Sequence, residues 1–181
     1  SDQSDFYISY RLSLDKIYLD HNATTPIAPE VLERVTSVLQ SQVGNPSSLH
    51  SEGRSARVLL DEAREQVASL IGASPSEIIF TSGGTEANNL ALLGVALGLG
   101  KIGDHIVTSQ VEHPSILNPC LQLERLGFEV DRAKVNSLGC IDSFEGYLKE
   151  STLLVSMQHA NSETGVLQDI KRVGEIAREK R

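Results

Sequence analysis

Thr81-Ser82-Gly83-Gly84-Thr85-Glu86-Ala87-Asn88-Asn89 is the stretch that decides the fold, because it follows the strand-like run Glu77–Phe80 and opens an apolar helix. Two glycines let the backbone approach an anion closely, and Ser82 and Thr85 add hydroxyl donors. The following helix directs unpaired N–H groups and the positive end of its dipole to the same place. The stretch therefore predicts a cradle for a phosphate group, with an ordinary glycine-rich turn as the alternative.

The cradle differs from the two common nucleotide motifs. It lacks the Gly-Lys pair of a Walker loop and the Gly-x-Gly-x-x-Gly spacing of dinucleotide-binding domains. A lone phosphate group is therefore the expected ligand.

Outward from the cradle, short apolar runs alternate with amphipathic segments of ten or so residues. The expected strands are 17–20, 78–81, 105–109, 129–133 and 153–158. The first expected helix begins at Pro29, and the further expected helices are 51–71, 86–99, 114–125, a segment near 143–149, and 170–180. This alternation predicts an α/β domain whose mostly parallel sheet is flanked by helices. Residues 1–16 lack periodicity and are expected to form an N-terminal arm, so that 17–181 make one domain.

Composition narrows the class of protein. The chain has 181 residues, of which 40% are hydrophobic, and 24 acidic against 16 basic residues give a net charge of -8. Without a basic cluster, neither nucleic acid nor an anionic membrane is an expected partner. The longest apolar run, 90–100, is too short to span a membrane, and no signal peptide is visible, so a cytoplasmic protein is expected. Cys120 and Cys140 lack metal or redox spacing and are interpreted as structural thiols, with no metal site.

Two more groups of polar residues follow expected strands. Glu112-His113 come after 105–109, and Asn161-Ser162 come after 153–158. The carboxyl ends of parallel strands face one edge of a sheet, so these residues and the cradle are expected to converge on one site. Pro114 holds His113 extended, and its imidazole could stack on an aromatic ligand or move a proton, although a surface histidine without a role is the alternative.

The residues around the second group have competing interpretations. Asn161 could hydrogen-bond a ligand or cap the turn that leads to Gly165. His159, at the end of the expected strand, is interpreted as a packed residue.

Five separated motifs together resemble the NifS/IscS-type cysteine desulfurases and selenocysteine lyases, which are class V, fold-type-I pyridoxal-phosphate enzymes. In chain order these motifs are 18–26, 44–50, 80–89, 111–113 and 161–165. The resemblance begins near Ile17 and continues to the end of the chain. It implies that the chain is the N-terminal part of the large, cofactor-binding domain of that fold.

The resemblance also implies roles for particular residues. Gly84 and Thr85 match the pair that holds the cofactor phosphate, and His113 matches the histidine that stacks on the pyridine ring and assists proton transfer. The family usually has two asparagines where this chain has Asn161 and Ser162, and the second approaches the ring hydroxyl of the cofactor. Ser162 departs from this pattern, and its shorter side chain can reach less far.

In the family, the lysine that tethers the cofactor and the cysteine that accepts sulfur lie beyond the position of Arg181. Lys171, Lys180, Cys120 and Cys140 match neither. The expected protein is therefore the N-terminal half of a desulfurase that converts L-cysteine to alanine and a persulfide, and it is expected to be inactive alone. The half could be a split subunit or a fragment of a longer protein.

The resemblance leaves other functions open. A non-catalytic scaffold or dimerisation homologue is one alternative, and a selenocysteine lyase is another. The expected partners are a second copy of the chain or a complementing C-terminal chain, and possible further partners include an Fe–S scaffold protein. An uncovered sheet edge and apolar helix face also favour a partner.

Overall fold

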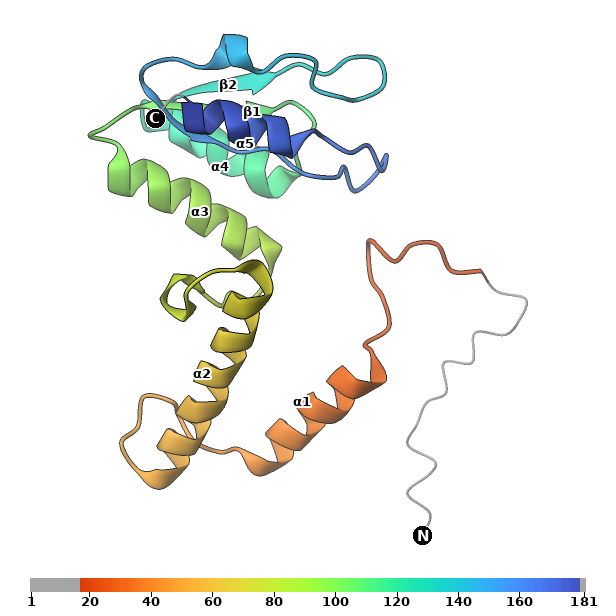
Figure 1. Cartoon of the computed structure of the whole chain (residues 1–181), viewed down its shortest axis with the longest axis vertical. Coiled ribbons are helices and arrows are strands. Elements are labelled where there is room, and N and C mark those ends of the chain that lie inside the picture. Colours follow the sequence, from red (N-terminus) through yellow and green to blue (C-terminus); the bar gives the residue numbers. More distant parts are fainter. Residues whose placement is uncertain (1–16, 180–181) are drawn as a thin grey trace. The chain divides into compact units, whose positions relative to one another are not determined.

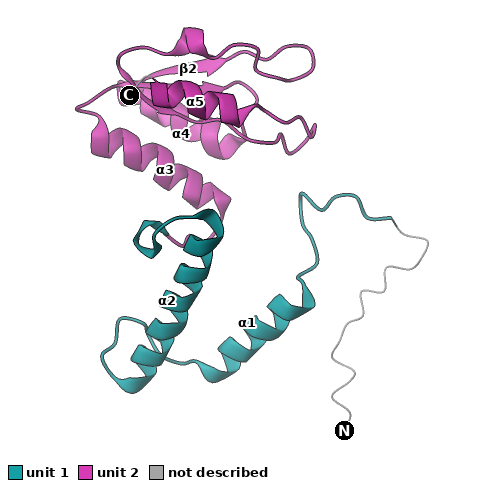
Figure 2. Cartoon of the chain, in the orientation of Figure 1, with its two compact units in different colours: residues 1–78 teal, residues 79–181 magenta. Residues whose placement is uncertain are grey.

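The computed structural model describes residues 17–179, and the arm expected at 1–16 lies outside them. The chain divides into two compact units, Ser1–Ile78 and Ile79–Arg181 (Figure 2). The first contains helices α1 (Pro29–Ser41) and α2 (Ser51–Ile71) and the short 3-10 helix η2 (Pro75–Glu77). No helix among residues 17–179 is long and apolar enough to cross a membrane.

Local signals set the ends of α2. Nδ1 of His50, the residue before the helix, accepts a hydrogen bond from the backbone N–H of Gly53 at 3.3 Å. Gly72 ends the helix in the left-handed conformation, with φ of 67°, which costs glycine little because it has no Cβ. The guanidinium of Arg64 then donates to the carbonyl of Ile78, which ties α2 to the segment after η2.

Two glycines pack the loop before α2 against the first turn of that helix. A Cβ at Gly44 would overlap the carbonyl of Glu52, and one at Gly53 would overlap the carbonyl of Ser48. Each overlap involves backbone atoms, so no side-chain movement can relieve it.

We expect Gly53→Ala to destabilise the protein by about 1–3 kcal/mol, because the extra methyl forces the backbone apart. The midpoint of urea unfolding measures this loss. Gly98→Ala is the matched control, since a Cβ at this helical position meets nothing within 4 Å. It should gain about 0.5–1 kcal/mol, and equal effects of the two changes would contradict the close packing at Gly53.

The second unit is a parallel α/β arrangement. It contains α3 (Gly84–Leu99), β1 (His105–Ser109), α4 (Pro114–Arg125), β2 (Glu129–Ala133), the 3-10 helix η3 (Glu145–Tyr147), β3 (Thr152–Val155) and α5 (Ile170–Glu179) (Figure 1). The strand order is β2-β1-β3, and both pairings are parallel. All five residues of β1 are buried, as a central strand requires. The predicted α/β fold with a parallel sheet is therefore confirmed.

Helices α3 and α4 supply most of the core of this unit. They contribute Leu92, Ala96, Ile116, Cys120 and Leu123, which pack with Ile106 of β1 and Val130 of β2. The Cys120 side chain is fully buried, and burial raises the pKa of its thiol. It is therefore a structural thiol, as predicted.

A second cluster joins the strands near their amino ends. The buried His105 ring contacts Oγ1 of Thr152 through Nδ1 at 2.8 Å and Oδ2 of Asp131 through Nε2 at 3.2 Å. Nζ of Lys149 also lies 3.1 Å from Oδ2 of Asp131. His105 thus links β1 to both neighbouring strands, at the end of β1 opposite the expected site.

Some predicted elements differ in the structure. Residues 17–20 and 78–81 form no strand, because no strand among residues 17–179 pairs with them. The helix expected near 143–149 is only the short η3, and the strand expected at 153–158 ends at Val155. The N–H of Ser156 still donates to the Val107 carbonyl of β1 at 2.8 Å, and beyond it the backbone forms the loop that carries the candidate site.

Candidate functional site

The start of α3 has the open backbone expected of the predicted cradle. Gly83 precedes the helix in an extended conformation, and a Cβ at either Gly83 or Gly84 would meet nothing within 4 Å. The first N–H groups of a helix have no partner within it, so those of Gly84 and Thr85 face an open approach. These features suit an anion.

A carboxylate that was not predicted from the sequence, that of Glu86, lies beside the cradle. Glu86 accepts hydrogen bonds from the backbone N–H and the hydroxyl of Ser82 at 2.7 and 2.6 Å, and these bonds lower the pKa of its carboxyl. The hydroxyl of Ser82 is therefore engaged within the protein. Among residues 17–179, Thr85 keeps its hydroxyl without a hydrogen-bond partner and is the side-chain donor left for a ligand.

A pocket of about 320 Å³ opens at the carboxyl ends of β1 and β3. Its lining comes from α3, α4 and the loops after the two strands: Asn88, Glu112, His113, Ile116, Ser156, Met157, Gln158, Ala160 and Ser162. His113 and Ser162, predicted from separate motifs, thus line one pocket. Gly84, Thr85 and Asn161 are not in its lining, although Asn88 follows Thr85 by about one turn of α3.

Hydrogen bonds join the two loops that form this pocket. Oε1 of Glu112 accepts from the hydroxyl of Ser109 and from the backbone N–H of Gln158, both at 2.8 Å. The carbonyl of Val111 accepts from the side-chain amides of Gln158 and Asn161, at 2.8 and 3.2 Å. The three bonds donated by Gln158 and Asn161 join residues 46 to 50 positions apart and hold the loop after β3 against the loop after β1.

Glu112 is a buried carboxyl whose pKa is raised by desolvation, although its two hydrogen bonds lower it in part. Because the folded pKa lies above the unfolded one, the contribution of this group to stability falls as the pH rises through the folded pKa. A glutamine keeps an oxygen acceptor and removes the charge. We therefore expect the unfolding free energy of Glu112→Gln, relative to the unchanged protein, to improve from pH 4 to pH 8.

Glu112→Ala serves as the control for the hydrogen bonds. It leaves the Gln158 N–H and the Ser109 hydroxyl without their acceptor, which costs about 1–3 kcal/mol for a buried group. Urea unfolding at the two pH values measures both variants. A Glu112→Gln variant whose relative stability worsens with pH would show that the ionised carboxylate is the favoured form.

The ring of His113 is held by the first turn of α4. His113 is the residue before the helix, and its Nδ1 accepts a hydrogen bond from the backbone N–H of Ser115 at 3.1 Å. The hydroxyl of Ser115 lies 2.8 Å from the same nitrogen, and Nδ2 of Asn88 donates to that hydroxyl at 2.8 Å. The ring itself is exposed, so a ligand can reach it.

Asn161 forms the turn before Gly165, which was one of its two interpretations. Its Oδ1 accepts from the backbone N–H groups of Glu163 and Thr164 at 3.0 and 2.9 Å, and Gly165 adopts φ of 74°. Its amide also donates to Val111. Asn161 therefore positions the exposed Ser162, and a direct contact of Asn161 with a ligand stays a prediction. His159, expected to be packed, is exposed instead, since β3 has ended before it.

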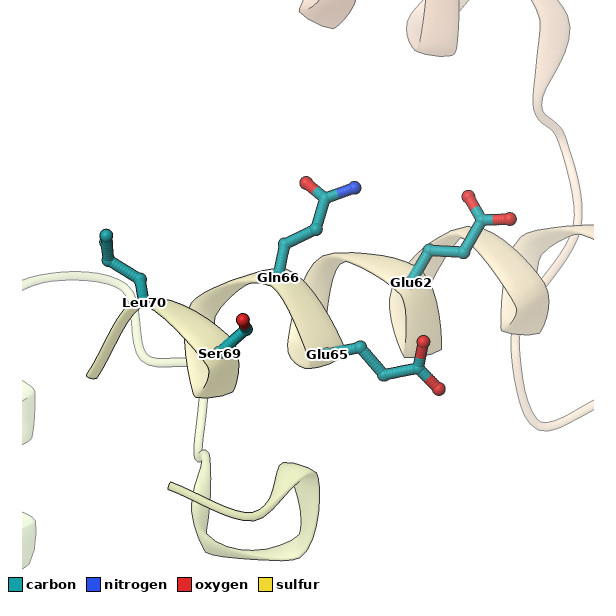
Figure 3. Close-up of a pocket in the computed structure, with 5 residues that line it drawn as sticks. All are labelled: Glu62, Glu65, Gln66, Ser69 and Leu70. Atoms are coloured by element: carbon teal, nitrogen blue, oxygen red, sulfur yellow. The ribbon is translucent and has the colours of Figure 1, made fainter. Parts of the chain in front are cut away.

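Another pocket, on α2, does not resemble a site. All five lining residues come from this one helix: Glu62, Glu65, Gln66, Ser69 and Leu70 (Figure 3). Their side chains project from the helix without converging on a common point (Figure 3). Among residues 17–179, no group of His, Cys, Asp and Glu side chains could hold a metal ion.

Comparison with known proteins decides the family. The sequence profile of the aminotransferase class-V family matches residues 17–181. The chain belongs to the aminotransferase class-V family. Within it, the chain is 47% identical over 166 residues to cysteine desulfurase IscS of Dictyoglomus turgidum, which covers 91% of this chain and 42% of that relative. It is 50% identical over 169 residues to cysteine desulfurase IscS of Proteus mirabilis, with the same two coverages.

Solved structures resemble this chain over most of its length. A NifS-like protein superposes with a TM-score of 0.87 at 38% identity, over 92% of this chain and 46% of that one. SspA in complex with cysteine gives a TM-score of 0.84 at 37% identity, over 91% and 48% of the two chains. The predicted resemblance to the N-terminal half of NifS/IscS proteins is confirmed. The chain spans less than half the length of these relatives.

Proposed function

We propose that this chain is the N-terminal, cofactor-binding half of a pyridoxal-phosphate-dependent cysteine desulfurase. The observation that carries the proposal is the pocket at the carboxyl ends of β1 and β3, which His113 and Ser162 line together with Asn88. Asn88 follows Thr85 of the cradle by about one turn of α3. Membership of the class-V family and identities of 47–50% to two cysteine desulfurases support the reaction class.

The residues present fit pyridoxal phosphate. The open glycine backbone and free N–H groups at the start of α3 suit its phosphate group, and the exposed imidazole of His113 offers a flat face for its ring. When bound, this cofactor acts as an electron sink that labilises bonds at the substrate α-carbon.

Each residue of the site has a defined role in this proposal. Gly84 and Thr85 bind the phosphate through backbone N–H groups and the Thr85 hydroxyl. His113 packs on the ring and holds or moves a proton through its imidazole. Ser162 donates a hydrogen bond toward the ring hydroxyl, directly or through a water molecule, in place of the longer asparagine of the family.

In this proposal the rest of the site lies in a sequence that corresponds to the part of the relatives not matched by this chain. We assign to it the lysine that tethers the cofactor and the cysteine that takes sulfur from L-cysteine, which leaves alanine and a persulfide. A homodimer or a complementing chain, a cytoplasmic location and delivery of sulfur to an Fe–S scaffold protein complete the proposal.

The test compares residues 1–181 with the assembled enzyme. The 181-residue chain is expected to release no sulfide from cysteine, because Lys171 lies on α5 and matches no part of the lysine motif. The assembled enzyme should be yellow from a lysine-bound cofactor and, with an added thiol reductant to cleave the persulfide, should release sulfide. Sulfide release by the 181-residue chain at the rate of the assembled enzyme would contradict the proposed division of the site.

Ser162 favours a second candidate, a homologue that keeps the fold as a scaffold or dimerisation partner and has lost the chemistry. A selenocysteine lyase is a third, since the motifs present do not separate sulfur from selenium. An assembled protein that stays colourless with added pyridoxal phosphate would support the scaffold. Turnover of selenocysteine but not of cysteine would support the lyase.

A further inference from the structure

We propose that the first turn of α4 holds the neutral ring of His113 with its proton on Nε2, and that Asn88 is a positioning residue that keeps the Ser115 hydroxyl donating to Nδ1. The catalytic value of this arrangement rests on the proposed function. Its structural basis is a chain of hydrogen bonds from α3 to the first turn of α4, Asn88 to Ser115 to His113.

The backbone N–H of Ser115 is the first of two donors that favour an unprotonated Nδ1. A backbone N–H can only donate, and the N–H of Ser115 is 3.1 Å from Nδ1 of His113. Nδ1 must therefore offer its lone pair and carry no proton. In a neutral imidazole the proton then resides on Nε2, for which residues 17–179 provide no hydrogen-bond partner.

The side chain of Asn88 sets the direction of the hydrogen bond between the Ser115 hydroxyl and Nδ1 of His113. Its amide Nδ2 donates to Oγ of the buried Ser115 at 2.8 Å, so that oxygen acts as an acceptor toward α3. The hydroxyl proton of Ser115 is then free to point to Nδ1 of His113, 2.8 Å away. The backbone N–H and the hydroxyl of Ser115 thus favour the same tautomer of His113. Asn88 supports this tautomer indirectly, through its hydrogen bond to the hydroxyl.

This arrangement leaves Nε2 as the nitrogen that exchanges a proton with a ligand. Asn88, His113 and Ser162 line the same pocket, so a change at Asn88 alters the ring without removing it. An aspartate at position 88 has nearly the same shape but only acceptor atoms. It would draw the Ser115 hydroxyl proton toward α3 and turn a lone pair of that oxygen toward Nδ1.

The experiment is nitrogen NMR of the full protein labelled with ¹⁵N-histidine and freed of cofactor, with the His113 signals identified by their loss in His113→Asn. The unchanged protein should show a bare Nδ1 and a protonated Nε2. Asn88→Asp should raise the Nδ1-protonated population. Asn118→Asp places the same charge on an exposed position of α4 and should leave the His113 signals unchanged.

Ser115→Ala distinguishes an effect transmitted through the Ser115 hydroxyl from a direct electrostatic effect of the charge at position 88. It removes the hydroxyl but keeps the backbone N–H, so the tautomer should stay as in the unchanged protein. Adding Asn88→Asp to it should then have no effect on Nδ1, since the connecting hydroxyl is gone. A shift that persists in the double variant, or a proton on Nδ1 in the unchanged protein, would overturn the proposal.

Activity provides a second readout that a purely structural role would not give. In the assembled enzyme, Asn88→Asp should lower kcat by about 10-fold to 100-fold, less than complete loss of an acid–base group, and change KM little. Failure of the protein to bind pyridoxal phosphate would overturn the proposed function while leaving the tautomer result standing. An Asn88→Asp variant with altered NMR signals and unchanged kcat would overturn the positioning role alone.

Discussion

Replacing His113 with alanine in the assembled enzyme is expected to lower kcat for sulfide release by about 10²–10⁴-fold, the usual contribution of a general acid–base group. His113 is the exposed imidazole of the pocket at the carboxyl ends of β1 and β3. Its loss removes both the flat face proposed to contact the cofactor ring and the proposed proton carrier. Steady-state sulfide release at saturating cysteine measures the effect.

His159→Ala is the matched control for this prediction. His159 is also exposed and follows β3, but it is not part of the pocket lining. Its replacement should change kcat by no more than a few-fold. His113→Asn adds a second comparison, because Asn can still cap α4 through its side-chain oxygen. A His113→Ala enzyme with at least half the original kcat would remove His113 from the proposed chemistry.

Local signals made most of the fold predictable from the sequence. The bounds expected for α2, β1, α4 and β2 agree with the structure, because Gly72, Pro114 and similar residues mark the ends of elements with regular apolar spacing. The runs at 17–20 and 78–81 look like strands by composition alone. A strand also needs a partner for its backbone groups, and no such partner is present among residues 17–179.

The grouping of His113 with Ser162 was predictable from the sequence, but the pocket lining does not include Gly84 or Thr85, and the hydrogen bonds within the site were not predictable. The rule that ligands gather at the carboxyl ends of strands was enough to bring His113 and Ser162 together. The bonds of Asn88 with Ser115, and of Glu112 with Gln158, join residues 27 and 46 positions apart. No local sequence pattern predicts hydrogen bonds between residues so far apart in the chain. Glu86, in contrast, could have been found from its spacing of four residues after Ser82 at a helix start.

The second large effect that we expect is a loss of affinity for pyridoxal phosphate in Thr85→Glu, a change in the cradle. Affinity of the assembled enzyme for pyridoxal phosphate should fall by about 100-fold or more, since losing a hydrogen bond to a charged group costs about 1.5–3 kcal/mol and about 1.4 kcal/mol corresponds to tenfold. The added carboxylate also repels the phosphate. Titration of cofactor-free enzyme, followed by absorbance, measures the affinity.

A carboxylate in the first turn of a helix interacts favourably with the helix dipole, so Thr85→Glu should preserve the stability of α3 while it weakens binding. Weaker binding with unchanged stability would separate a binding defect from unfolding. Urea unfolding of the cofactor-free variant measures the stability. Thr85→Ser retains the hydroxyl and should keep the affinity within a few-fold of the original. If Thr85→Glu bound the cofactor as tightly as Thr85→Ser, the phosphate could not lie at the start of α3, and the cradle would be only the glycine-rich turn that its sequence also allows.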